Sequence, residues 1–206
     1  MIINWGDAPF KAFLSVTYPR GTCTVSNGNK TYTHSGGGTH SFVVQQRGAW
    51  TVKATASNAE AITTVNIKKQ NETQSITLKY TKTITVNLSA SAYDDDGYQN
   101  TDLDVFATKQ DLSAYKTIKF TVTSRTWTEG LGLTPYSWIR LGISSSASAA
   151  PSKYVTINGT GATTATLDIS GISSGYISAY CSANASYTQT AKGTAAVKVS
   201  TVILSS

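Results

Sequence analysis

Polar and apolar residues alternate in short runs along most of the chain. In the run from Gly48 to Ala56 one face is apolar and the other polar, with Trp50, Val52, Ala54 and Ala56 on the first and Thr51, Lys53 and Thr55 on the second. A period of two residues is typical of a β-strand that buries one face. No apolar run with a period of 3.6 residues is long enough to predict a helix. The pattern therefore predicts an all-β protein.

The first part of the chain contains seven such runs, which predict the strands Ala12–Thr17, Thr22–Ser26, Lys30–His34, Thr39–Val44, Trp50–Ala56, Ala61–Ile67 and Thr73–Tyr80. Turn-forming residues separate many of them, as in Pro19-Arg20-Gly21, Asn27-Gly28-Asn29, Gly36-Gly37-Gly38 and Arg47-Gly48. This many short strands in so short a segment favours a small sandwich of two sheets over residues 11–82.

The rest of the chain, residues 83–206, continues with alternating apolar positions. The expected core positions are Ile84, Val86 and Leu88; Ile118, Phe120 and Val122; Ile139, Leu141 and Ile143; Ala165, Leu167 and Ile169; Ile177, Ala179 and Cys181; and Val197, Val199 and Ile203. Six or more strands suit a jelly-roll or a similar sandwich. We therefore expect two tandem β-sandwiches.

Residues 1–10 precede the first expected sandwich and are too short to fold alone. They include Trp5 and Phe10, two aromatic residues among small and turn-forming ones. Two interpretations remain open. These aromatic residues attach the chain to another protein, or they pack on its own first domain.

The net charge of +6 is uneven, since residues 1–82 carry +6 and residues 83–206 carry zero. The basic residues of the first part are scattered over strands and turns, which favours a solvated surface over a nucleic-acid site. The first nine residues show no secretory signal, and no segment resembles a membrane span. We expect folding in a cytoplasm, with Cys23 and Cys181 as buried free thiols.

The sequence is poor in groups for catalysis. His34 and His40, the only histidines, flank the glycine-rich turn Ser35–Gly38 on what we expect to be one hairpin. They could share a metal ion, but no cysteine or carboxylate in that segment completes a ligand shell, so exposed hairpin histidines are the favoured interpretation. Only three glutamates are present, and no nucleophile elbow is found. We therefore expect no enzymatic activity.

One acidic segment carries enough closely spaced carboxylates to suggest a metal site. It places five carboxylates within eleven residues around Gly97, namely Asp94, Asp95, Asp96, Asp102 and Asp104. Hard oxygen ligands beside a glycine turn suit calcium, although the spacing does not follow the helix-loop-helix calcium pattern. A structural calcium loop is one hypothesis, and a solvated acidic loop is the other.

One irregular stretch gathers aromatic and basic residues: Arg125, Trp127, Tyr136, Trp138 and Arg140. Sugars present apolar C–H faces that stack on aromatic rings, while polar neighbours bind their hydroxyls. Because Trp138 alternates with Ile139, its side chain should point away from the core. These residues predict a glycan-binding platform. The alternative is that the aromatic rings are buried under their own loop or against a neighbouring subunit.

Two resemblances to known families follow from particular segments. The order of Ser15–Pro19, Thr22–Gly28, Phe42–Val44, Gly48–Val52 and Gln74–Tyr80 resembles the carboxypeptidase-regulatory or PEGA-like immunoglobulin-type modules, which share a transthyretin-like sandwich and are common in prophage structural proteins. The segments Asp111–Phe120, Leu167–Ile172 and Gly175–Ile177 resemble carbohydrate-binding-module and galactose-binding-like sandwiches. The first resemblance implies a spacer or attachment unit.

These resemblances imply a non-enzymatic bacteriophage virion accessory protein, either a head decoration, a head fibre or a tail-associated component. Such a protein would be made in the host cytoplasm and incorporated in the virion. Its expected partners are other virion proteins, further copies of itself and host-surface glycans, with no nucleic acid and no membrane. The alternative is a carbohydrate-binding or adhesion module of a bacterial surface protein, located on the cell surface or secreted.

Overall fold

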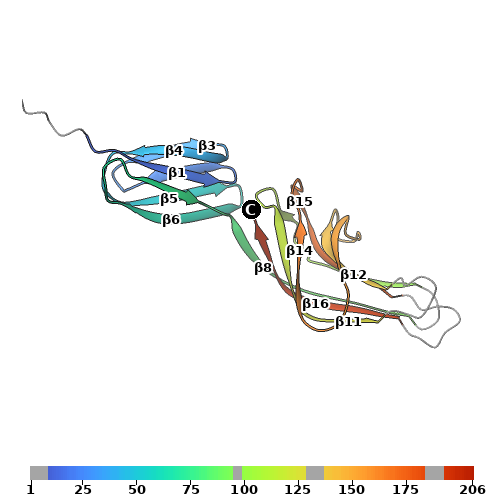
Figure 1. Ribbon diagram of the computed structural model, residues 1–206. Helices are drawn as coiled ribbons and strands as arrows, with labels where there is room; N and C mark the ends of the chain where they lie inside the picture. The colour runs from blue at the N-terminus through green and yellow to red at the C-terminus, as the bar shows by residue number, and fades with distance from the viewer. Residues whose placement is uncertain (1–8, 95–98, 129–136, 184–192) are drawn as a thin grey trace, which may run out of the picture. The chain divides into compact units, whose positions relative to one another are not determined.

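A computed structural model describes residues 9–94, 99–128, 137–183 and 193–206. All regular secondary structure in these ranges is β-strand, so the predicted all-β sandwich fold is confirmed. The described residues form no helix that could cross a membrane. The chain divides into two compact units, Met1–Thr81 and Lys82–Ser206 (Figure 1).

The first unit holds seven strands: β1 (Ala12–Tyr18), β2 (Thr22–Ser26), β3 (Thr31–Ser35), β4 (Gly38–Val44), β5 (Gly48–Ala56), β6 (Ala59–Ile67) and β7 (Thr73–Thr77). One sheet has the order β4-β1-β7, and the other has the order β3-β2-β5-β6. Strand β1 runs antiparallel to β4 and parallel to β7. The strand bounds differ from the predicted ones by only a few residues, since the period-two pattern marks each strand directly.

The core of the first unit is built mainly from the apolar faces of β1, β2, β4 and β5. On β5, the side chains of Trp50, Val52 and Ala54 are completely buried, as the alternation predicts. The indole N–H of Trp50 donates a hydrogen bond to the carbonyl of Gln46 at 3.1 Å, so its one polar atom is satisfied inside the sandwich.

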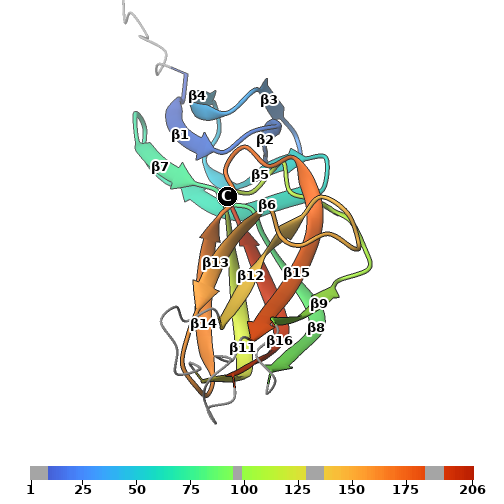
Figure 2. The same ribbon diagram turned by 90° about the vertical axis from the view of Figure 1, so that its right-hand side faces the viewer.

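The second unit holds nine strands: β8 (Thr81–Asp94), β9 (Asn100–Val105), β10 (Gln110–Asp111), β11 (Thr117–Thr128), β12 (Trp138–Ser144), β13 (Lys153–Ile157), β14 (Thr163–Asp168), β15 (Ser174–Ala183) and β16 (Gly193–Ser205). One sheet has the order β14-β11-β16-β8 (Figure 2). The other has the order β10-β15-β12-β13, and β9 also pairs with β15. Both sheets bury apolar side chains against each other, with Ile118, Phe120, Ile139 and Leu141 completely covered.

Two core predictions in the second unit are wrong, because Ile84 is only half-buried and Ile203 lies off the core face. Val197 and Val199 are buried as expected, but Val202 and Leu204 follow them into the core, and Ile203 does not. The pairing of β11 with β16 shifts here, because Val122 lies opposite Val199 while Thr121 lies opposite Thr201. The extra residue forms a β-bulge, which reverses the alternation along the rest of β16.

The free edge of β8 is covered by carboxylates from β9. Asp104 accepts a hydrogen bond from the backbone N–H of Ser89, and Asp102 accepts one from that of Ser91, both at 2.6 Å. The two acceptors and the two donors have the same two-residue spacing, so a short side-chain ladder joins one sheet to the edge of the other. Edge N–H groups otherwise remain open to pairing with another chain.

Two glycines of the first unit provide a matched test of its turn geometry. Gly21 and Gly28 have nearly equal positive φ angles of 87° and 86°. A Cβ at Gly21 would lie 1.9 Å from the carbonyl oxygen of Thr55, whereas one at Gly28 would meet nothing within 4 Å.

We therefore expect Gly28→Ala to lower the free energy of unfolding by about 1 kcal/mol, the strain of a left-handed residue alone. Gly21→Ala should cost about 3 kcal/mol or more, since the backbone of β5 must also move. Denaturant unfolding of the whole chain, followed by the fluorescence of its four tryptophans, measures both. Equal losses for the two variants would contradict the packing described for this turn.

Candidate functional site

Trp138 and Arg140 lie on β12 and point away from the space between the two sheets. Ile139 and Leu141, which alternate with them, are completely buried, while Trp138 and Arg140 retain part of their exposed surface. The outward direction of Trp138 follows from this alternation. These two residues therefore belong to the outer face of the sheet.

Two tyrosines join them on that face. The rings of Trp138 and Tyr180 meet edge to face, with centroids 4.7 Å apart and planes at 69°. The guanidinium carbon of Arg140 lies 3.9 Å from the Trp138 ring centroid and 4.2 Å from that of Tyr154. We call Trp138, Arg140, Tyr154 and Tyr180 the outer cluster. It combines three rings with one cation held against two of them, a contact favoured by the ring quadrupole.

The cation of the outer cluster has no protein acceptor in the described part of the chain. The Nε atom of Arg140 is buried without a hydrogen-bond partner, and the only described ion pair joins Lys53 and Glu60 in the first unit. The strand register also places no aspartate or glutamate on the outward positions of β9, β12, β13 and β15. Among the described residues, the charge of Arg140 therefore meets ring faces and no carboxylate.

Tyr154 and Tyr180 are the members that the sequence analysis missed. Each lies on the polar face of its strand, so alternation alone predicts that its side chain points outward. Alternation does not predict which residues lie beside it, because that depends on the pairing of β12 with β13 on one side and with β15 on the other. Arg140 lies directly opposite Tyr180 in that register. Strand pairing brings residues separated by tens of positions into one cluster.

Arg125 and Trp127, the other two described members of the predicted platform, lie on β11 with their side chains on the inner face. They pair with Val197 and Ala195, both buried. The indole N–H of Trp127 donates to the carbonyl of Ser137 at 2.9 Å. A Cβ at Gly159 would lie 3.5 Å from an Nη atom of Arg125, so the guanidinium lies against that glycine. Arg125 and Trp127 are therefore half-buried on the same face as these buried partners, and Tyr136 lies outside the described residues.

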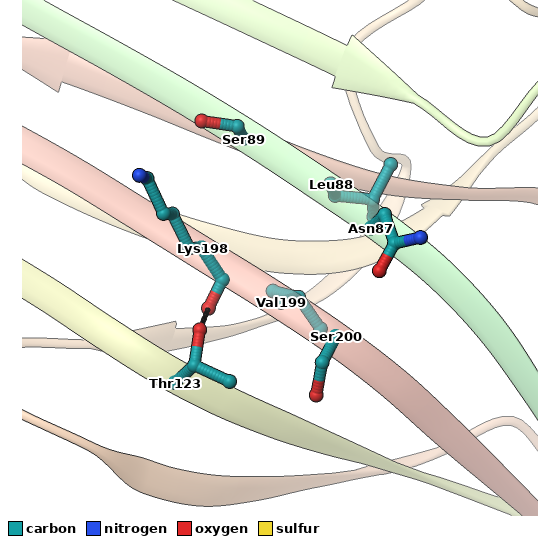
Figure 3. A pocket seen from close by; sticks show the side chains of 7 residues that line it. All are labelled: Asn87, Leu88, Ser89, Thr123, Lys198, Val199 and Ser200. Carbon is teal, nitrogen blue, oxygen red and sulfur yellow. Dashed lines mark hydrogen bonds between the residues drawn. The ribbon is translucent and has the colours of Figure 1, made fainter.

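A polar hollow lies over the other sheet, formed by β8, β11 and β16 (Figure 3). It has a volume of about 290 Å³ and is lined by Asn87, Leu88, Ser89, Thr123, Lys198, Val199 and Ser200. Asn87 has a positive φ of 50°, and Thr123 and Ser200 are the residues left unpaired by the register shifts. The hydroxyl of Thr123 donates to the carbonyl of Lys198 at 3.3 Å. The hollow offers hydroxyls and an ammonium group but no ring.

The acidic segment of the calcium hypothesis is only partly described. Asp102 and Asp104 bind backbone N–H groups of β8, as set out above, and Asp94 is buried at the end of that strand. Asp95 and Asp96 lie outside the described residues. Among the described ones, no three metal-binding side chains gather closely enough to hold an ion. Structural calcium stays a prediction, and a calorimetric titration with calcium tests it.

The two histidines differ from the sequence prediction. His34 lies on β3 and His40 on β4, which belong to different sheets and are not a hairpin pair. Their rings stack with centroids 3.8 Å apart, and both are half-buried. The Tyr18 hydroxyl lies 2.6 Å from Nδ1 of His34. The chain crosses between the sheets at Ser35–Gly38, which brings the rings face to face instead of exposing them.

Both cysteines are buried and free, as predicted. Burial raises the pKa of the Cys23 thiol. Burial, with a smaller contribution from the charge of Asp102, raises the pKa of Cys181 to about 12. Since the thiolate is the reactive and metal-binding form, both side chains act as apolar packing groups at neutral pH.

The described end of the leader packs on the first unit. The guanidinium carbon of Arg47 lies 5.2 Å from the ring centroid of Phe10, and the backbone carbonyl of Pro9 accepts a hydrogen bond from the Gln70 side chain. For Phe10, this favours packing on its own unit over attachment elsewhere. Trp5 lies outside the described residues, so its predicted attachment role stays a prediction.

Comparison with known proteins gives no family for this chain. No model of a protein family matches it, and no curated protein matches it. A crystal structure named as that of a proposed pore-forming toxin from Bacteroides vulgatus aligns with 97% of this chain and 92% of its own, at 12% identity. The TM-score of that alignment is 0.21, which is too low to carry an argument about fold or function.

The carboxylate ladder on the edge of β8 leads to a stability prediction. Asp104→Ala removes the acceptor of the Ser89 N–H, and we expect it to lower the free energy of unfolding of the second unit by about 1 kcal/mol. Asp104→Asn retains a carbonyl acceptor and should lose less. Denaturant unfolding and amide exchange at Ser89 measure the difference. Unchanged exchange in the alanine variant would show that the carboxylate does not protect this edge.

Proposed function

We propose that this protein is a non-enzymatic binding and attachment protein whose outer cluster contacts a glycan. The observation that carries the proposal is the gathering of Trp138, Tyr154 and Tyr180 around Arg140 on the outer face of one sheet. Aromatic rings stack on the C–H faces of sugars, and a neighbouring guanidinium donates hydrogen bonds to their oxygens. Tyr154 retains 40% of its surface, so part of this face is open to a ligand.

A binding role is also supported by the state of the potential reactive groups. His34 stacks on His40 beside the Tyr18 hydroxyl, and Cys23 lies opposite His34 on the neighbouring strand. A cysteine and a histidine on paired strands resemble a nucleophile and its base, but burial raises the pKa of Cys23 and so works against a thiolate. The proposal therefore includes no catalytic step.

The proposed setting is a bacteriophage virion, as a head decoration, head fibre or tail-associated component made in the host cytoplasm. It rests on the resemblance of the first unit to prophage immunoglobulin-type modules. The sheets β4-β1-β7 and β3-β2-β5-β6, with β1 parallel to β7, support that resemblance. In this setting the first unit attaches to other virion proteins or to further copies of the chain, and the second unit contacts host-surface glycans.

The second candidate is a carbohydrate-binding or adhesion module of a bacterial surface protein. The outer cluster supports it as well, because the same face would serve a glycan in either setting. Electron microscopy of the native source separates the two. Labelled antibody on phage particles supports the virion, and label on the bacterial surface supports the adhesion module.

Substitution of the cluster tests the proposed binding. We expect Trp138→Ala to reduce glycan binding by about 5- to 150-fold, because a stacked ring contributes on the order of 1–3 kcal/mol. Tyr93→Ala is the control, since Tyr93 is an aromatic residue on β8 of the other sheet with 43% of its surface accessible, close to the 40% of Tyr154 in the outer cluster. A glycan array followed by titration of the bound sugars measures both variants.

Two results would contradict this proposal. Binding that survives Trp138→Ala but is lost in Tyr93→Ala would place the site on the other sheet. An array on which nothing binds, together with a change of oligomeric state in Trp138→Ala, would show that the outer cluster is a contact between copies of the chain. Sedimentation analysis of both variants provides that second readout.

A further inference from the structure

From the environment of Arg140 we infer that the glycan bound by the outer cluster is acidic, with its carboxylate or sulfate held by the guanidinium. This inference rests on the proposed function and goes further, because it names the chemical class of the ligand. It depends on three features of the site, which are the contact of the guanidinium with two rings, the lack of a counter-ion among the described residues and the small exposed apolar area that these residues leave around it.

The guanidinium of Arg140 packs against two rings. Its central carbon lies 3.9 Å from the Trp138 centroid and 4.2 Å from the Tyr154 centroid. Tyr180 supports the arrangement from the next strand by its edge-to-face contact with Trp138. An arginine side chain normally loses considerable freedom when it binds a ligand. Here the rings restrict that freedom before binding, so less is lost.

The donors of this guanidinium are left to a ligand. Nε is buried and has no acceptor among the described residues, so the terminal Nη groups are those available at the surface. The outward positions of β9, β12, β13 and β15 carry no acidic residue, and no described ion pair involves Arg140. The planar fork of a guanidinium matches two oxygens of a carboxylate, sulfate or phosphate group.

The surroundings favour a sugar over a protein surface as the bearer of that acid. Among the described residues of the second unit, only two large hydrophobic side chains are exposed, Tyr154 beside Arg140 and Tyr93 on the other sheet. A stable protein interface needs a much larger apolar patch. Thr156, directly opposite Arg140 on β13, adds a hydroxyl to this face. Rings, a hydroxyl and a cation packed against those rings suit an acidic sugar.

The test uses the full chain and oligosaccharides in matched sets. Each set contains a neutral chain of glucose, galactose or mannose, the corresponding uronate chain and a sulfated chain. We expect the acidic members to bind about 10- to 100-fold more tightly than the neutral one, the factor given by hydrogen bonds to a charged group. Tighter binding of the uronate chains alone shows that the site recognises a carboxylate. Tighter binding of both the uronate and the sulfated chains shows that it recognises either anionic group.

Variants of Arg140 connect that preference to the site. Arg140→Gln should abolish the difference between acidic and neutral sugars while stacking on Trp138 retains weak binding of both. Arg140→Lys keeps the charge but not the fork and should retain part of the difference. Lys119→Gln is the matched control, because it removes one positive charge from an exposed position on β11 of the other sheet. Melting temperature and near-ultraviolet circular dichroism check the fold of each variant.

The failure of this inference differs from the failure of the proposed function. Equal binding of neutral and acidic sugars, lost in Trp138→Ala, would overturn the acidic ligand and leave the glycan site in place. An acidic preference that persists in Arg140→Gln would also overturn it. Absence of binding to every sugar would overturn the proposed function together with the inference.

Discussion

The burial of Ile139, Leu141 and Ile143 between the two sheets of the second unit is the constraint on which the candidate site depends. These side chains are nearly or completely covered, and each contributes roughly 1.5–3 kcal/mol by leaving water. Because side chains alternate along a strand, the same burial forces Trp138 and Arg140 to the opposite face. A slip of one residue would expose the three apolar side chains and bury a guanidinium, which is far more costly than any contact in the outer cluster.

Strand pairing then brings outward side chains of β13 and β15 next to those of β12, and together they form the candidate site. Tyr180 on β15 lies directly opposite Arg140, and Tyr154 on β13 contacts Arg140 from a diagonal position. Gly142 permits this arrangement, since a Cβ there would lie 2.2 Å from the carbonyl oxygen of Lys153. The close approach of β13 to β12 therefore depends on the missing side chain of Gly142. Because Tyr154 lies on β13, this approach also brings Tyr154 to Arg140.

Much of the fold could be predicted from the sequence, because each strand shows its own period of two. The runs around Trp50, Val52 and Ala54, or around Ile139 and Leu141, need no knowledge of other strands. Features that depend on pairing could not be predicted. The bulge that moves Ile203 out of the core arises between β11 and β16, and the separation of His34 from His40 into two sheets depends on sheet membership.

The same distinction applies to the site. Trp138 and Arg140 were found because they share one strand, whereas Tyr154 and Tyr180 were missed because only the register of three strands brings them together. Arg125 and Trp127 were grouped with Trp138 through nearness in sequence, yet they face inward beside Val197 and Ala195. Asp102 and Asp104 resembled metal ligands by density alone, while their geometry is that of acceptors for the edge of β8.

The central claim is that the outer cluster, and no other face of the second unit, meets the ligand. Nuclear magnetic resonance of the full chain during titration with the array-selected glycan tests it most directly, with the indole N–H signals assigned by single tryptophan variants. We predict that the Trp138 indole and the Arg140 side-chain signals shift together while the Trp127 indole and Tyr93 signals do not. Shifts confined to Trp127, or to the hollow around Asn87 and Lys198, would contradict the account.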